Sequence, residues 1–141
     1  MCAGAAGAQE VPKGVWMLQN GKAAVSFHPC GKKGEELCGT LVWGRKDQYP
    51  DGQTKDVRNP DPKLRGRELC GAEVVWGLEW EGDGTWSGGR VYDPHSGKTY
   101  GARLEILGPE RLKVRGYIGI PWIGKTQNWK PAPPDLEVCG G

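Results

Sequence analysis

The fold of this chain is decided by one stretch, Trp86-Ser87-Gly88-Gly89-Arg90-Val91-Tyr92-Asp93-Pro94-His95-Ser96-Gly97-Lys98-Thr99-Tyr100. Aromatic and β-branched residues flank a centre of turn-forming residues. Asp93 can accept hydrogen bonds from the backbone ahead of it, and Pro94 presets φ for the second position of a turn. Gly97 can adopt a positive φ and restart strand pairing. We therefore predict a β-hairpin, the central one of a single all-β domain.

The composition is typical of one all-β domain. A chain of 141 residues is long enough for a core of its own. Its 24 glycines and 11 prolines are spread out rather than periodic, which suits many short strands joined by tight turns. Seven tryptophans stand against one phenylalanine. Because the indole N–H needs a partner, several should line a cavity or lie where a sheet meets water.

Charge and hydropathy argue against a nucleic-acid partner and against a chain that spans a membrane. The formal net charge is +2, from 19 basic and 17 acidic side chains, and no long basic run is present, so we expect no nucleic-acid partner. No stretch reaches the roughly 18 apolar residues of a transmembrane helix. We therefore expect a protein that does not span the membrane.

The chain has five cysteines, an odd number that leaves at least one thiol unpaired or intermolecular. No Cys-x-x-Cys pair or zinc-like Cys/His spacing is present, and we predict no metal site and no cofactor. Cys30 and Cys38 flank a turn rich in glycine and charge, Gly31 to Glu36. A disulfide across that hairpin would suit an oxidising compartment, and buried free thiols are an equally open alternative.

Residues 1–13 are expected to be flexible. Ala6-Gly7-Ala8 before Gln9 resembles the cleavage end of a secretory signal. An ordinary disordered N-terminus is the alternative. The signal-like interpretation favours export across the inner membrane.

Eight segments carry strand signals, either alternating apolar and polar residues or β-branched and aromatic enrichment. Eight short strands with mostly tight turns favour an eight-stranded antiparallel up-and-down β-barrel, because closure removes exposed edges. Such a barrel can be filled by side chains or hold one small ligand. If it closes, both termini emerge at one end, where Cys2 and Cys139 could meet. The segments are Gly14–Leu18, Lys22–His28, Leu37–Gly44, Cys70–Trp80, Trp86–Tyr92, Lys98–Leu107, Leu112–Ile118 and Lys125–Trp129.

Two segments lack strand signals. Arg45 to Arg67 is a long irregular segment in which Pro62 to Arg65 could form one helical turn. Loops of this length are usually functional, and we expect it to cross one end of the barrel. The proline-rich segment from Pro131 to Gly141 is expected to be a loose tail, which leaves residues 14–130 as the barrel domain.

Several motifs, taken together and in order, are similar to an uncharacterised bacterial family known as DUF2147. The resemblance implies a calycin or lipocalin-like barrel in the envelope of Gram-negative bacteria, and it supplies no catalytic residues. Gly14-Val15-Trp16 is also similar to the lipocalin Gly-x-Trp motif. The matching segments are Leu37-Cys38-Gly39 through Val42-Trp43, Asn59-Pro60-Asp61-Pro62, Leu69-Cys70-Gly71, Trp86 to Tyr100, Arg115 to Gly119, and Gly124-x-Thr126-Gln127-x-Trp129.

Patterns that would indicate catalysis or nucleotide binding are weak. Gly119 to Thr126 matches the phosphate-loop pattern by letter, but the residues that follow cannot begin the long helix whose N-terminus holds phosphate. His28 and His95 are the two histidines, and no nucleophile elbow or carboxylate pair stands out. An anion could bind at one end of the barrel, although structural roles are favoured for the residues that could gather there. They are Arg115, Tyr117, Lys98 and Asp93, with Arg65 and Arg67 from the long segment. We expect a protein that is not an enzyme.

The leading hypothesis is a periplasmic binding protein for a small, largely apolar ligand. Aromatic side chains would line the cavity, and Arg115 or Tyr117 would orient a polar end of the ligand. The alternative is a structural module with a filled barrel that binds another envelope protein through an outer face or the Arg45–Arg67 segment. The candidate ligand-binding residues are Trp16, Trp76, Trp86, Tyr100, Arg115 and Tyr117.

Overall fold

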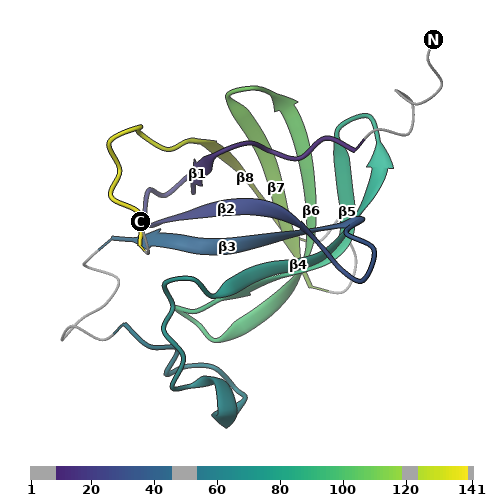
Figure 1. The fold of residues 1–141 in the computed structure, drawn as a ribbon. Coiled ribbons are helices and arrows are strands. Elements are labelled where there is room, and N and C mark those ends of the chain that lie inside the picture. Colours follow the sequence, from purple (N-terminus) through teal and green to yellow (C-terminus); the bar gives the residue numbers. More distant parts are fainter. Residues whose placement is uncertain (1–8, 46–53, 119–123, 140–141) are drawn as a thin grey trace.

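The computed structural model describes residues 9–45, 54–118 and 124–139. Over these residues the chain forms a closed barrel of eight strands, each antiparallel to its neighbours in sequence order (Figure 1). The first strand closes on the last through Trp16 opposite Pro131 and Met17 opposite Lys130. The predicted up-and-down barrel is confirmed. The strands are β1 (Val15–Met17), β2 (Ala23–Cys30), β3 (Glu36–Gly44), β4 (Glu73–Gly82), β5 (Thr85–Asp93), β6 (Lys98–Gly108), β7 (Arg111–Tyr117) and β8 (Gly124–Pro131).

The β5–β6 turn forms as its residues predict. The Asp93 carboxylate accepts hydrogen bonds from the backbone N–H of His95 at 3.0 Å and from Ser96 Oγ at 2.8 Å. Gly97 has a φ of +75°, a conformation that costs glycine little. These contacts satisfy the turn locally, so the hairpin is encoded by adjacent residues.

The two ends of the barrel differ in their connections. At the end that we call the closed end, short turns join β2 to β3, β4 to β5 and β6 to β7. Large apolar side chains beside these turns are completely buried and fill the interior there. They are Leu37, Leu78, Trp86, Leu104 and Leu112. At the opposite end, the open end, a long segment joins β3 to β4 (Figure 1).

The inward face of β4 changes phase along the strand. Val75 and Leu78 are both buried although they are three residues apart, and Trp76 points outward with 36% of its surface exposed. Gly77 between them has a φ of +71°, which interrupts the two-residue alternation of a strand. The predicted inward position of Trp76 is therefore wrong.

Within the described residues, two disulfides link Cys30 to Cys38 and Cys70 to Cys139. The first crosses the β2–β3 hairpin, which is one of the two states that the sequence left open. The second corrects the expected approach of Cys139 to Cys2, a residue that lies outside the described ranges. A backbone hydrogen bond of 2.7 Å from Cys139 N–H to the Val42 carbonyl adds to it. The C-terminal segment is thus anchored beside the end of β3, rather than loose (Figure 1).

The described part of the segment between β3 and β4, residues 54–72, is called here the β3–β4 loop. It contains the single helical turn that the sequence indicates, a 3-10 helix at Pro62–Leu64 whose N-cap Asp61 accepts from Lys63 N–H at 3.0 Å. At the closed end, the Trp86 indole N–H donates to the Glu10 carbonyl at 2.8 Å. No helix in the described ranges is long and apolar enough to cross a membrane.

Candidate functional site

The open half of the barrel encloses a cavity of about 890 Å³. This volume lies within the range of pockets that bind small molecules. Its walls are mostly apolar and come from strands on every side of the barrel. They include Val25, Leu41, Val75, Val91, Val114 and Trp129.

The cavity exists because the inward side chains of the open half are small. Val75 lies opposite Val91 on the neighbouring strand, and both line the cavity. Gly116 on β7 contributes no side chain, and a Cβ placed there would lie 3.9 Å from Tyr100 and from Val91. The inward positions toward the closed end of the same strands carry Leu78, Trp86 and Leu112. Because valine and glycine are smaller than leucine and tryptophan, the open half of the barrel retains space that is filled in the closed half.

The mouth of the cavity is both charged and apolar. Among the residues that the structure describes, four cationic side chains line it together with one carboxylate, Asp93, whose oxygens already accept the two hydrogen bonds of the β5–β6 turn. Val57 and Ile118 also lie there, with 48% and 70% of their surfaces exposed. An apolar compartment with a basic rim follows from this arrangement. The cationic residues are Lys22, Lys55, Arg58 and Lys125.

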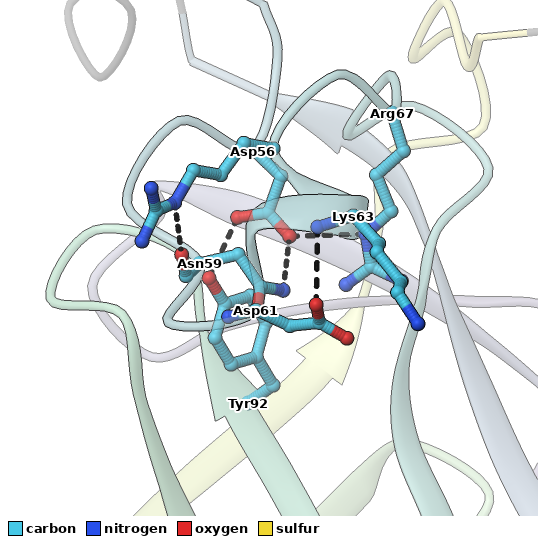
Figure 2. Close-up of polar contacts among 7 residues, drawn as sticks. Asp56, Asn59, Asp61, Lys63, Arg67 and Tyr92 are labelled. Atoms are coloured by element: carbon cyan, nitrogen blue, oxygen red, sulfur yellow. Dashed lines mark hydrogen bonds and ion pairs between the residues drawn. The ribbon is translucent and has the colours of Figure 1, made fainter.

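The β3–β4 loop is held against the barrel by a buried carboxylate, Asp56, which is 1% exposed (Figure 2). Asp56 Oδ1 accepts from the Tyr92 hydroxyl at 2.6 Å. Its Oδ2 accepts from Asn59 Nδ2 and from Arg67 Nε, each at 2.9 Å. We call these four residues the Asp56 cluster. Because every donor is directed at one carboxylate, the buried charge is compensated and the loop is fixed to β5.

Tyr92 joins the cluster to the cavity, whose wall it also lines. Burial and the hydrogen bond to the Asp56 carboxylate raise the pKa of the Tyr92 phenol far above its ordinary value. The Arg67 guanidinium lies 5.8 Å from the centre of the Tyr92 ring, within reach of a cation–π interaction. Tyr92 therefore remains a neutral donor to Asp56 at any physiological pH.

A second contact fixes the same loop to the β5–β6 turn. Arg58 Nη1 donates to the His95 carbonyl at 2.9 Å. A Cβ at Gly97 would collide with the Arg58 carbonyl, so the close approach requires glycine as well as the positive φ. Lys55, Val57 and Arg58 on the mouth are positioned through these anchors.

The residues that the sequence indicated for ligand binding are distributed over three regions. Tyr100 and Tyr117 line the cavity, and the Tyr117 ring also lies against Gly101 of β6. Trp16 and Trp86 are buried away from the cavity, 2% and 1% exposed, within the packed core. Trp76 is on the outer surface for the reason given above.

Arg115 is also placed away from the cavity. It alternates with the inward residues Val114 and Gly116, and its Nη1 donates to Thr126 Oγ1 on β8 at 2.7 Å. The predicted cavity positions of Trp16, Trp76, Trp86 and Arg115 are therefore wrong, whereas that of Tyr100 agrees with the structure. Tyr117 borders the cavity, but it alternates with Gly116 as Arg115 does, and its ring lies over Gly101 on the outward face.

Three features of the site escaped the sequence analysis. The valines of the wall gave no signal beyond that of ordinary strand residues. Lys125 shares a face with Gln127 and Trp129 on β8, an alternation that is readable in the sequence. Asp56 lies in a segment with no periodic pattern, and its partner Tyr92 is 36 residues away.

The arginines of the β3–β4 loop have structural roles, as favoured above. Arg67 pairs with Asp56, and Arg65 Nε donates to the Asn59 carbonyl at 2.8 Å. Among the described residues, His28, Cys38 and Glu73 place potential metal-ligating atoms within 4.8 Å of one another. The Cys38 sulfur is bonded to Cys30, so it offers no thiolate and the group does not fit a metal ion.

The match to known proteins covers the whole barrel. Residues 14–131 match the model of a family described as "Uncharacterized protein conserved in bacteria (DUF2147)". The chain belongs to this family. No curated protein matches the sequence.

One solved structure is similar in both fold and sequence. It is protein HP1028 from the human pathogen Helicobacter pylori, which is described as belonging to the lipocalin family. The match has a TM-score of 0.73 and 26% identity, and covers 91% of this chain and 86% of HP1028. This member of DUF2147 thus has a lipocalin-like barrel.

Proposed function

We propose that this DUF2147 protein is a non-enzymatic binding protein for a small, largely apolar ligand in the bacterial cell envelope. The observation that carries the proposal is the cavity of about 890 Å³ with walls of valine, leucine and aromatic side chains. A pocket of this size and lining gains free energy by burying apolar ligand surface. The similarity to HP1028, described as a lipocalin family member, is consistent with this role.

Two further observations support the proposal. The disulfides Cys30–Cys38 and Cys70–Cys139 suit an oxidising compartment such as the periplasm. Two of the ionisable side chains at the cavity make structural hydrogen bonds: Asp93 accepts within the β5–β6 turn, and Arg58 donates to the His95 carbonyl. Neither is set up as a nucleophile with a base.

A structural module with a filled barrel was the alternative. An open apolar cavity is the feature that a packing role would not need, because filling it with larger side chains would increase stability. Binding of a protein partner, the role of such a module, is therefore one of the outcomes that the experiment distinguishes.

Native mass spectrometry of protein purified from the envelope of its own host tests the proposal, followed by extraction of the bound material. A stoichiometric extra mass is expected on the wild type. Gly116→Phe fills the cavity, since a Cβ at this position meets no atom closer than 3.9 Å. It should lose the extra mass while folding normally.

The matched control is Lys113→Phe, which places the same ring on the outward face of β7 and should keep the ligand. Repeated preparations of wild type without any extra mass, together with a protein recovered by cross-linking, would replace the proposal with the interaction role. Equal ligand occupancy in wild type and Gly116→Phe would place the ligand outside the cavity.

A further inference from the structure

We propose that the ligand is an anionic amphiphile with a single aliphatic chain. Its chain lies in the cavity and its carboxylate or phosphate head lies at the mouth, between Lys22 and Lys125. This inference rests on the proposed binding function and names the chemical class of the ligand.

The charges at the mouth of the cavity favour an anionic ligand. Within the described part of the chain, the charged lining of the mouth consists of four cationic side chains and one carboxylate, Asp93, and His95 also lies there. Asp93 is already engaged by His95 N–H and Ser96 Oγ, and Arg58 by the His95 carbonyl. In residues 9–45, 54–118 and 124–139, Lys22 and Lys125 take part in none of the ion pairs found. The two ammonium groups therefore remain available to a ligand.

The order of residues along β8 favours a ligand with one polar end and one apolar end. Lys125, Gln127 and Trp129 alternate along β8 and all line the cavity. The order along this inward face is thus an ammonium group at the rim, an amide below it and a buried indole ring. The polarity of the wall thus decreases from the rim inward. A fatty acid whose chain enters first would match this order, with its head group at the rim and its chain below.

Lys22 supplies the second cation from a neighbouring part of the rim. It immediately precedes β2, whose Ala23 and Val25 line the same cavity. In the barrel order β1 lies between β8 and β2. The two lysines therefore lie on one side of the mouth, above apolar wall, where one head group can interact with both.

Alternative ligand charges fit this mouth less well. A cationic amphiphile would meet repulsion from the lysines, and a neutral one would leave their charges unused. An anion at the rim gains charge-assisted hydrogen bonds from both ammonium groups. The aliphatic chain supplies most of the affinity, about fourfold for each methylene buried.

Displacement of the neutral fluorophore N-phenyl-1-naphthylamine from the full chain tests the inference. The competitors are hexadecanoate, hexadecanol and hexadecyltrimethylammonium, each below its aggregation concentration. Hexadecanoate should bind about tenfold more tightly than hexadecanol, a difference that decreases with salt, and the cation most weakly. An arm with monohexadecyl phosphate distinguishes a fatty acid from a phosphate-bearing lipid fragment.

Variants identify the head-group site. Lys22→Gln with Lys125→Gln should weaken hexadecanoate about tenfold and leave hexadecanol and the fluorophore unchanged. The matched control is Lys113→Gln with Lys130→Gln, which removes two outward lysines from β7 and β8 and should change neither affinity.

The outcomes separate this inference from the proposed function. Equal affinities for hexadecanoate and hexadecanol, or an equal loss in both double variants, would overturn the inference while cavity binding stands. A fluorophore that fails to bind, with no ligand seen by native mass spectrometry, would overturn both.

Discussion

The closed and open halves of this barrel share the same strands but fill their interiors differently. In the closed half the inward positions carry side chains such as Trp86 and Leu78, which are 1% and 0% exposed. In the open half they carry Val91, Val114 and Gly116, which surround the cavity. Side-chain volume, rather than strand pairing, separates a packed core from a binding chamber.

The two halves of the barrel are also stabilised by different kinds of contact. Dense packing supplies the apolar stability of the closed half. The open half gives up part of that packing and is held by polar and covalent links instead, the Asp56 cluster and the Cys70–Cys139 disulfide. A binding site is thereby built beside a core that does not depend on it.

The strongest test of this comparison is a large-to-small substitution in each half. Trp86→Ala should cost about 5 kcal/mol of unfolding free energy, near the top of the range for buried aromatics. Val114→Ala should cost about 1 kcal/mol, because its methyl groups already face a cavity. Urea denaturation measures both, and equal costs would contradict the division into two halves.

The two disulfides test the ends of the barrel separately. Cys70 and Cys139 are 69 residues apart, and Cys30 and Cys38 are 8 apart. Loop-closure entropy predicts a loss of about 4 kcal/mol for Cys70→Ser with Cys139→Ser, against about 2.5 kcal/mol for Cys30→Ser with Cys38→Ser. Thermal unfolding of each double variant would show the order, and the reverse order would mean that strain or residual structure dominates.

Removal of the buried carboxylate should release the β3–β4 loop without unfolding the barrel. Asp56→Ala leaves the Tyr92 hydroxyl and Arg67 unpaired, and we expect a local loss of about 3 kcal/mol. Hydrogen exchange of residues 54–69 should increase while β5 and β6 stay protected. Asp61→Ala removes an exposed cap in the same loop and should cost about 1 kcal/mol. Faster exchange throughout the barrel would show that the loop is part of the global folding unit.

Tyr92→Phe should cost less than the loss of the whole Asp56 carboxylate, about 1.5 kcal/mol from one hydrogen bond to a charged acceptor. The raised pKa of Tyr92 adds a pH signature. In the unfolded chain the phenol ionises near the ordinary tyrosine pKa of 10.0, whereas in the folded protein it stays protonated. Stability is therefore intact below about pH 10 and falls as the pH rises above it.

Urea midpoints between roughly pH 9 and 11 should show this decrease in the wild type and a shallower one in Tyr92→Phe. Tyr117→Phe is the control and should keep the wild-type slope. Identical slopes in all three proteins would remove Tyr92 from the linkage.

Much of the fold was predictable because its signals are local. Asp93, Pro94 and Gly97 specify their turn through contacts within a few residues. The alternation of Leu112 and Val114 specifies the inward face of β7 in the same way. The prediction failed at Trp76, because the positive φ of Gly77 changes the strand phase. It failed at Cys139 because its partner Cys70 is distant in sequence.

The candidate site was less predictable than the fold. Tyr100 and Tyr117 were identified as aromatic residues near the correct end, whereas Trp16 and Trp86 were assigned to the cavity but lie in the packed core. A tryptophan in a strand signals burial, but its size decides whether the space around it is filled or open. The alternation of apolar and polar residues in the sequence does not indicate how much space remains between the inward side chains.

By itself the sequence determined the β class, the order of the strands and the tight turns, since hydrophobic alternation and turn chemistry act between neighbouring residues. The tertiary structure alone decided which half of the barrel is hollow and which residues surround the mouth. It also decided how Asp56, Tyr92 and Arg67 meet around one buried charge. These features depend on barrel closure, which brings together side chains from distant parts of the chain and sets the volume left between them.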